Sequence, residues 1–423
     1  MVVIFTLLWP EFLRVPLGLA QMSVPRFAAL VIIAKQLSSK DAMRFRWNWI
    51  DAMVLGGWAW ELAANIFAGA DQTVVTYMIG RVFDTASIYL AARLSLRGAK
   101  DYADLVPPLM LVAVTMGIFG FLESAVMHQS VYERIFGIVP EQWFVKEDEF
   151  RYGFLRAKAS TGHAIYFGMA MVVITGMLVA LQGFAGRYRY FIWPAIGCGF
   201  LGALSSMSSG PQLALVILLI TSSFWFYKGL IKPALVALLL LAVIAEAGSN
   251  RHFYQLIDYL ALSSETAWYR TRLLEVAVGH MREYWLVGLG GRSPHHWALE
   301  IDGRLHVDLV NHFVIVATQG GLLGLGMYLG AIVGAIKSAA RVASKSQDRA
   351  FAKAGFFLVC LLLAIANASM SVGLFGAPLL LTYALLGAMV ALPGAATTTL
   401  PNSLGPSSAR ARSAGGFARE ARS

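Results

Sequence analysis

Two histidines lie where polar loops of the chain turn into long apolar segments. His312 follows Asn311 and precedes the apolar residues 313–334, and His163 precedes the apolar residues 164–181. An imidazole changes its charge near neutral pH, so it can accept a proton from a hydroxyl group. His312 is therefore the candidate catalytic base. The alternative for either histidine is an interface residue whose hydrogen bonds are already satisfied.

Basic side chains gather in two loops that are far apart in the sequence. Arginine presents a planar fork of N–H donors that matches the oxygens of phosphate. We therefore expect these loops to bind a diphosphate, with His163 beside it; contact with ordinary anionic head groups, or with solvent, is the alternative. The cationic residues are Arg151, Arg156 and Lys158 in the first loop, and Arg270 and Arg272 in the second.

Three other patterns could do chemistry, and each has a simpler explanation. Arg81 and Asp84 are three residues apart in an apolar segment and can pair on one helix face, as a functional site or as a structural ion pair. The glycines of 320–334 favour close helix packing over a nucleotide loop, because no strand precedes them. One loop is rich in metal-capable side chains without metal-site spacing, so neither metal nor cofactor is expected: His295, His296, Glu300, Asp302, His306 and Asp308.

Composition sets the class of protein that positions these residues. Hydrophobic residues make up 58% of the 423 residues and charged residues only 14%, which indicates an all-α, polytopic membrane protein. The net charge is +10, and the basic residues lie in short clusters between apolar runs. This pattern indicates membrane topology rather than nucleic-acid binding. Cys198 and Cys360 lie inside apolar runs and are expected to be packing residues.

The apolar runs predict about twelve membrane spans. Five basic clusters then fall on one side of the membrane, which predicts that both termini are cytoplasmic. We expect spans one to nine in 1–248, including an external loop at 126–160. A large external loop should follow at 249–307, with spans ten to twelve in 308–393 and a disordered tail at 394–423. The spans are 2–18, 25–38, 50–68, 73–92, 105–125, 161–181, 191–207, 211–227, 233–248, 308–335, 354–371 and 376–392.

The second long loop contains a predicted amphipathic helix over 266–285, begun by Ser263 or Ser264 and stopped by Gly288. Its apolar positions recur at helical spacing, and its tryptophans favour a membrane interface, so we expect it to lie on the outer leaflet. The alternative is a helix packed on neighbouring loops. The apolar positions are Leu274, Ala277, Val278, Met281 and Trp285.

Residues 266–330 combine an arginine on a helix, the glycine turn Val287-Gly288-Leu289-Gly290, Asn311-His312, and the run Gly320-Gly321-Leu322-Leu323-Gly324. This combination resembles the bacterial superfamily of O-antigen ligases and O-antigen or exopolysaccharide polymerases. Weaker similarity extends to Gly153-Phe154-Leu155-Arg156-Ala157 and to Gly162-His163. Two departures stand out: Phe313 follows the histidine where many members have Asn or Ser, and the turn 208–211 lacks an arginine.

The resemblance implies a membrane glycosyltransferase of the C-type fold, metal-independent and inverting, in the bacterial inner membrane with its active face toward the periplasm. Such an enzyme transfers an oligosaccharide from undecaprenyl diphosphate to a sugar acceptor. We expect a polymerase of O-antigen or exopolysaccharide. The alternatives are a ligase that acts on the lipid A-core of lipopolysaccharide, and a flippase for lipid-linked sugars. Membrane lipids, a chain-length regulator and the pathway's flippase are the expected partners, and nucleic acid is not.

Overall fold

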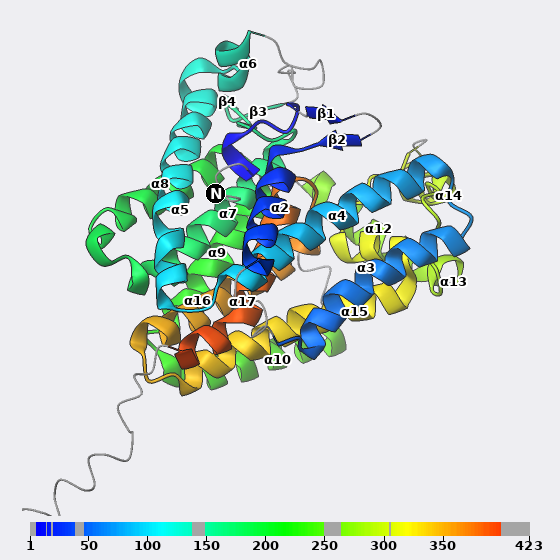
Figure 1. Cartoon of the computed structure of the whole chain (residues 1–423). Coiled ribbons are helices and arrows are strands. Elements are labelled where there is room, and N and C mark those ends of the chain that lie inside the picture. Colours follow the sequence, from blue (N-terminus) through cyan, green and yellow to red (C-terminus); the bar gives the residue numbers. More distant parts are fainter. Residues whose placement is uncertain are drawn as a thin grey trace, which may run out of the picture.

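The computed structural model describes residues 6–13, 15–17, 20–38, 46–137, 149–248, 264–303 and 306–398. Within these ranges the chain is almost wholly helical, with two short antiparallel hairpins (Figure 1). The strands are β1 (Val15–Leu17), β2 (Ala20–Met22), β3 (Phe150–Arg151) and β4 (Phe154–Leu155). The α-helices are α2 (Val24–Leu37), α3 (Trp49–Phe67), α4 (Gln72–Ser95), α5 (Ala99–Phe121), α6 (Val131–Phe136), α7 (Ala164–Leu181), α8 (Ile192–Ser205), α9 (Ser209–Ser223), α10 (Ile231–Gly248), α12 (Ser264–Gly279), α13 (Met281–Tyr284), α14 (His295–Ile301), α15 (His312–Lys345), α16 (Arg349–Ser369) and α17 (Ala377–Thr398). A π-helical turn, η2 (Leu122–Met127), extends α5, and short 3-10 turns are η5 (Gln182–Phe184), η6 (Gly186–Tyr188) and η7 (Lys228–Leu230).

Helix α7 lies at the centre of the molecule. It is apolar on every side, and nearly all of its residues are buried, as expected for a helix surrounded by others. Helices α5, α8, α9, α16 and α17 pack around it. The three long helices α7, α16 and α17 therefore form a core against which the charged loops are held.

Helices α3 and α15 lie side by side (Figure 1). Gly320 and Gly324 of α15 face Trp60, and the Trp60 indole donates a hydrogen bond to the Gly320 carbonyl over 2.7 Å. Gly334 packs against Ile50 and Trp49 at the other end of the pair. The expectation that the glycines of 320–334 permit close helix packing is confirmed at Gly334, where a Cβ would lie 2.7 Å from Ile50, but not at Gly326, where a Cβ would meet nothing within 4 Å.

A break at Gly321 interrupts α15, where φ is 65° and ψ is −171°. Only glycine adopts this conformation without strain. The break leaves backbone groups available to residues 285–289: the Leu289 N–H donates to the Thr318 carbonyl over 2.7 Å, and the Leu322 N–H donates to the Trp285 carbonyl over 2.8 Å. The segment after α13 is thereby attached to the first part of α15.

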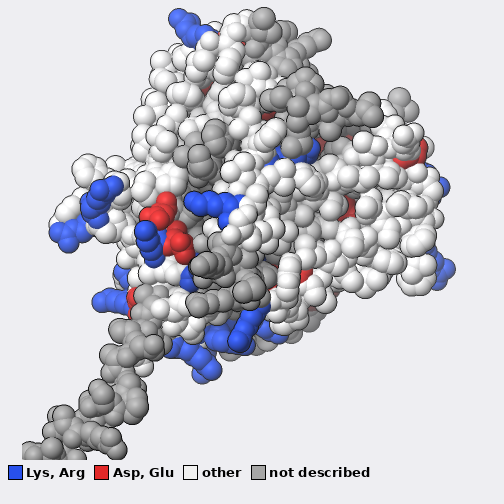
Figure 2. All heavy atoms as spheres, in the orientation of Figure 1, with Lys and Arg blue, Asp and Glu red and all other residues white. Residues whose placement is uncertain are grey.

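The apolar helices indicate a membrane-embedded protein, but the prediction of twelve spans is wrong. In the described part of the chain, five helices are long and apolar enough to cross a membrane, or six if the pair α9 and η7–α10, bent by 111°, is one broken span. The five are Ala99–Met127, Ala164–Phe184, His312–Lys345, Arg349–Ser369 and Ala377–Thr398. Much of the visible surface carries no charged side chain, and Lys and Arg gather mainly along its lower and left edges (Figure 2).

The missing spans have identifiable causes. Helices α2 and α8 have only 14 residues each, fewer than the roughly 20 that a hydrocarbon core requires. Helices α3 and α4 are long enough but carry charges, with Glu61 on α3 and Arg81 and Asp84 on α4. In place of the span at 2–18, the described residues form a short turn and β1.

Two further predictions need correction. Arg81 and Asp84 do not pair with each other: Asp84 accepts from Arg26 of α2 over 2.5 Å, and Arg81 pairs with Glu61 of α3. The helix predicted over 266–285 is broken, because α12 ends at Gly279, a residue of low helix propensity, and α13 follows His280. The N-cap predicted at Ser263 and the tail from residue 399 onward lie outside the described residues.

The buried face of α12 also differs from the predicted one. Leu273, Val276 and Ala277 are buried against Trp297 of α14 and against the start of α15. Val278, one of the positions predicted to face apolar surroundings, is 57% exposed. The face of α12 formed by Leu273, Val276 and Ala277 thus packs on neighbouring protein. This was the alternative considered for the predicted helix.

Candidate functional site

The hairpin of β3 and β4 presents Arg151. Its two turn residues, Tyr152 and Gly153, both have positive φ angles, 52° and 82°, which is the geometry of a tight type I′ turn. Arg151 pairs in register with Phe154, and its guanidinium donates to the Met207 carbonyl over 3.2 Å. One donor group of Arg151 is thus used for positioning, which fixes the side chain at the entrance to α9.

The chain that follows the hairpin is held by two glutamates. The Glu123 carboxylate, in η2, accepts backbone hydrogen bonds from Val131, Lys158 and Ala159 at 2.9, 3.0 and 2.8 Å. Glu149 pairs with the Lys158 ammonium at 2.5 Å. Lys158, one of the predicted cationic residues, is therefore buried and neutralised by its own partner.

His163 is the N-cap of α7, and its Nδ1 accepts a hydrogen bond from the Ile165 N–H over 3.1 Å. Burial, followed by the nearby charges of Arg156, Lys158 and Arg151, lowers the pKa of His163 to about 4. The imidazole is consequently neutral at physiological pH.

The structure separates Arg270 from Arg272, which the sequence could not do. Arg272 forms a surface pair with Glu275 at 3.1 Å, and its side chain is 41% exposed. Arg270 is half-buried on the other side of α12. Burial, followed by the nearby charge of Arg151, lowers the pKa of Arg270. Among the described residues, none accepts a hydrogen bond from the Arg270 guanidinium or pairs with it.

Electrostatic effects relate four of the predicted substrate-binding residues: the charges of Arg151 and Arg156 act on His163, and the charge of Arg151 acts on Arg270. Arg272 is not among them. We call this group the cationic cluster, and it consists of Arg151, Arg156, His163 and Arg270. Its members come from a hairpin, a loop, a helix cap and α12. Like charges held together in a partly buried place repel one another, so the cluster is suited to a multivalent anion.

His312 lies at the first turn of α15, where the Asn311 side chain caps the helix by accepting from Phe313 and Val314. The imidazole is 3% exposed. Its Nδ1 accepts a hydrogen bond from the Leu374 N–H over 3.3 Å. Neutral imidazole has one acceptor nitrogen and one N–H, so this contact leaves Nε2–H as a donor. The geometry favours hydrogen-bond donation by His312 over the proposed base role.

A small cavity of ≈30 Å³ lies beside His312 and is lined by Glu61, Arg81, Gly320 and Tyr328 among others. Arg81 pairs with Glu61 and also donates to the Gln319 side chain over 2.5 Å. The cavity has room for about one water molecule. His312 is thus set in a packed polar network rather than at an open surface.

A much larger groove of ≈1100 Å³ lies on the other side of Arg81. Its lining includes Glu11, the Arg26–Asp84 pair and Tyr166. Arg81 lines both the groove and the small cavity. The groove is large enough for an extended ligand with polar and apolar parts.

Two side-chain contacts connect the cationic cluster with the region of His312. Tyr166 lies 5.4 Å from His163 and 5.9 Å from Phe375, measured between ring centres, and Leu374, next to Phe375, bonds His312. On the other side, the Tyr269 hydroxyl exchanges hydrogen bonds with the Asp308 backbone at 2.8 and 3.2 Å. Burial raises the pKa of Asp308. Residues 163–166, 269–270, 308–312 and 374–375 therefore belong to one neighbourhood.

Sequence reasoning missed the acidic residues that organise this neighbourhood. Glu123 positions the loop before His163, and Glu11 accepts from the backbone of Gly162 over 3.2 Å and of Ala377 over 3.0 Å. Both are isolated acidic residues within predicted spans, and a charge at such a position is a signal of function or of a buried partner. That signal could have drawn attention to both residues.

Comparison with known families found no matching family model, and no curated protein matches the chain.

Proposed function

We propose that the chain is a membrane glycosyltransferase of surface polysaccharide biosynthesis. It transfers an oligosaccharide from undecaprenyl diphosphate to a sugar hydroxyl on the periplasmic face of the bacterial inner membrane. The observation that carries the proposal is Arg270, a half-buried guanidinium beside Arg151 for which no described residue supplies an acceptor. A diphosphate supplies the charge and the oxygens that this position lacks.

The reaction requires little beyond charge stabilisation. The acceptor oxygen bonds to the anomeric carbon as the bond from that carbon to the diphosphate oxygen breaks, and the diphosphate leaves with the electron pair. The hydroxyl proton passes to a base or to solvent. Attack opposite the leaving group inverts the anomeric centre. Arg151, Arg156 and Arg270 would stabilise the departing diphosphate, and each donor contributes on the order of 10²–10³ in rate in comparable sites.

Two features support placing the phosphate group at the cationic cluster. The cluster lies at the N-terminal end of α7, where the helix dipole favours negative charge. The neutral His163 adds an uncharged donor or acceptor to the site.

His312 acts in this proposal as a donor from Nε2, toward an ordered water in the adjoining cavity. The proton then leaves by another route, and the candidate base is Asp308, a carboxylate four residues before His312 whose pKa is raised by burial. A raised carboxylate pKa brings a general base closer to neutral pH. Polymerisation is favoured over ligation because the stretch 153–163 resembles polymerase members.

A flippase for lipid-linked sugars is the second candidate, and the groove of ≈1100 Å³ beside the Arg26–Asp84 pair favours it. Charged residues inside helices that line a large cavity are typical of transport pathways. The three activities leave different glycans behind. Deletion should yield single repeat units on lipid A-core for a polymerase, polymer left on undecaprenyl diphosphate for a ligase, and cytoplasmic-side repeat units for a flippase.

The test is complementation of the deletion strain with Arg270→Ala and, as the matched control two residues away, Arg272→Ala. We expect polymer to be lost with the first variant and kept with the second, at equal protein levels in the membrane. Full polymer with Arg270→Ala would remove the observation on which the proposal rests.

A further inference from the structure

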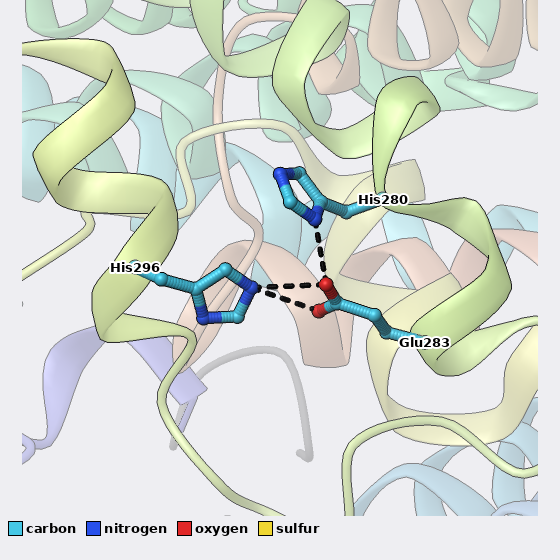
Figure 3. A group of neighbouring side chains, drawn as sticks. All are labelled: His280, Glu283 and His296. Atoms are coloured by element: carbon cyan, nitrogen blue, oxygen red, sulfur yellow. Dashed lines mark hydrogen bonds and ion pairs between the residues drawn. The ribbon is translucent and has the colours of Figure 1, made fainter.

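A second group of chemistry-bearing residues lies away from the cationic cluster, where α13 meets α14. His280 and Glu283 come from the chain around α13, and His296 comes from α14; the three side chains point toward one another (Figure 3). The His280 Nδ1 lies 2.6 Å from Glu283 Oε1, and the His296 Nε2 lies 3.0 Å from both Glu283 oxygens. One nitrogen or oxygen of each residue falls within 4.8 Å of the others.

We propose that His280, Glu283 and His296 form a binding site for a divalent transition-metal ion of the zinc type. Two imidazole nitrogens and one carboxylate oxygen are a common three-ligand set for zinc, with a fourth position left to water. Ligands about 2.0–2.1 Å from a tetrahedral ion lie about 3.3 Å apart. The observed separations from Glu283 Oε1 are 2.6 Å for His280 and 3.0 Å for His296, so they need to widen by about 0.7 Å and about 0.3 Å.

The surroundings of His280 favour a cation. Its Nδ1 faces Glu283, and its Nε2 faces Glu300 Oε1 at 2.8 Å. Both contacts are hydrogen bonds when the ring is an imidazolium, because only that form carries two N–H groups. A metal ion on Nδ1 supplies the positive charge in its place and leaves Nε2–H to donate to Glu300. That arrangement, a carboxylate behind a metal-bound histidine, is the usual outer support of such sites.

Glu283 is supported as well. The indole N–H of Trp297 donates to Glu283 Oε2 over 3.3 Å. Trp297 is fully buried in the cluster that joins α12, α14 and α15, so its indole is a fixed donor. The ligand side chains themselves remain open to solvent, with His280 25% and His296 51% exposed. An ion from solution can therefore reach a site whose carboxylate is already oriented.

The site differs from the metal-capable loop seen in the sequence. Of that loop only His296 and Glu300 take part, while the ring of His295 lies 5.5 Å from that of His306. A metal here would attach the end of α12 and α13 to α14. The inference does not depend on the glycosyltransferase proposal.

The experiment uses the full-length protein, without a histidine tag, in detergent and stripped of metal by a chelator. Titration with Zn²⁺ should give one equivalent bound, and Co²⁺ should give the visible absorption of a four-coordinate N/O site. His296→Ala should weaken Zn²⁺ binding by at least about 100-fold, and its neighbour on the same helix, His295→Ala, should bind as the wild type does. The wild type binding no Zn²⁺, or the two variants losing it equally, would overturn the proposal.

A second variant keeps the test decisive if His296→Ala does not accumulate. Glu300→Gln leaves all three ligands in place and should weaken Zn²⁺ binding by about 10–100-fold, as outer-support substitutions do. Unchanged affinity in this variant contradicts the role given to Glu300 and the ligand geometry built on it. Binding of Ca²⁺ in preference to Zn²⁺ also contradicts the proposal, because calcium prefers oxygen ligands.

Discussion

Replacement of Arg270 by alanine should stabilise the empty protein, or leave its stability unchanged, while removing most of its response to diphosphate. Arg270 is half-buried, has Arg151 as its charged neighbour, and has no acceptor among the described residues. Its charge therefore opposes folding until an anion binds. Sites built for ligands commonly reduce stability in this way.

The size of the effect follows from the contacts that a guanidinium makes. A hydrogen bond to a charged group contributes about 1.5–3 kcal/mol, so loss of Arg270 should weaken diphosphate binding by about 10–150-fold. At a pyrophosphate concentration of about 100 times the dissociation constant, the wild type gains about 2.7 kcal/mol. A variant that binds about 100-fold more weakly gains only about 0.4 kcal/mol under the same conditions.

The assay is thermal unfolding of the purified protein with and without pyrophosphate. At about 2 °C per kcal/mol for a chain of this size, the wild type should gain about 5 °C more than Arg270→Ala. Arg272→Ala should respond like the wild type, because an exposed pair such as Arg272–Glu275 contributes no more than about 1 kcal/mol. Equal responses of the two variants, or a large loss of stability in Arg270→Ala without ligand, would refute the reasoning.

Three more predictions follow from the neighbouring residues. His163→Asn keeps a good helix cap but removes an imidazole whose pKa is lowered to about 4. The unfolded chain takes up this proton first, so wild-type stability is complete above about pH 6.5 and falls toward about pH 4. In denaturant unfolding between about pH 6.5 and about pH 4, the free energy of unfolding of the variant should fall by on the order of 1–3 kcal/mol less than that of the wild type. Equal falls would contradict the lowered pKa of His163. Gly321→Ala places a Cβ against the Leu286 carbonyl at a positive φ and should cost at least about 1–3 kcal/mol in thermal unfolding; Gly326→Ala, whose Cβ meets nothing within 4 Å, should cost nothing. If His312 donates from Nε2, the transfer rate should not change between about pH 6 and about pH 8. A wild-type rate that falls toward about pH 6, together with no such fall in His312→Gln, would instead show that His312 acts as a base.

The helical class of fold and the two loops that supply the cationic residues could be predicted from the sequence, because both depend on local patterns. Long apolar runs indicated a helical membrane protein, and the two basic loops contain the residues that meet in the cationic cluster. The choice between Arg270 and Arg272 could not be made. Both lie on one helix, and only the packing of Leu273, Val276 and Ala277 decides which of them turns toward Arg151.

The number of spans could not be predicted because charge compensation acts between distant residues. Arg81 and Asp84 suggest a local pair, yet their partners are Glu61 on α3 and Arg26 on α2. The hydropathy of each segment alone does not report these partners. The metal-capable group shows the same limit, since His280 and Glu283 lie 13 or more residues before His296 and meet it only after α14 folds back.

The contact between α3 and α15 also constrains how the protein is synthesised. Arg81 donates to Gln319, a residue made 238 positions later, and Trp60 bonds Gly320 across 260 positions. At about 5–20 residues per second, the ribosome needs about 10–50 s to supply these partners. For that time the Trp60 indole lacks its acceptor, and Arg81 has only Glu61 of α3 as a partner. Nascent chains that end before residue 319 should therefore remain bound to an insertase, and longer chains should be released.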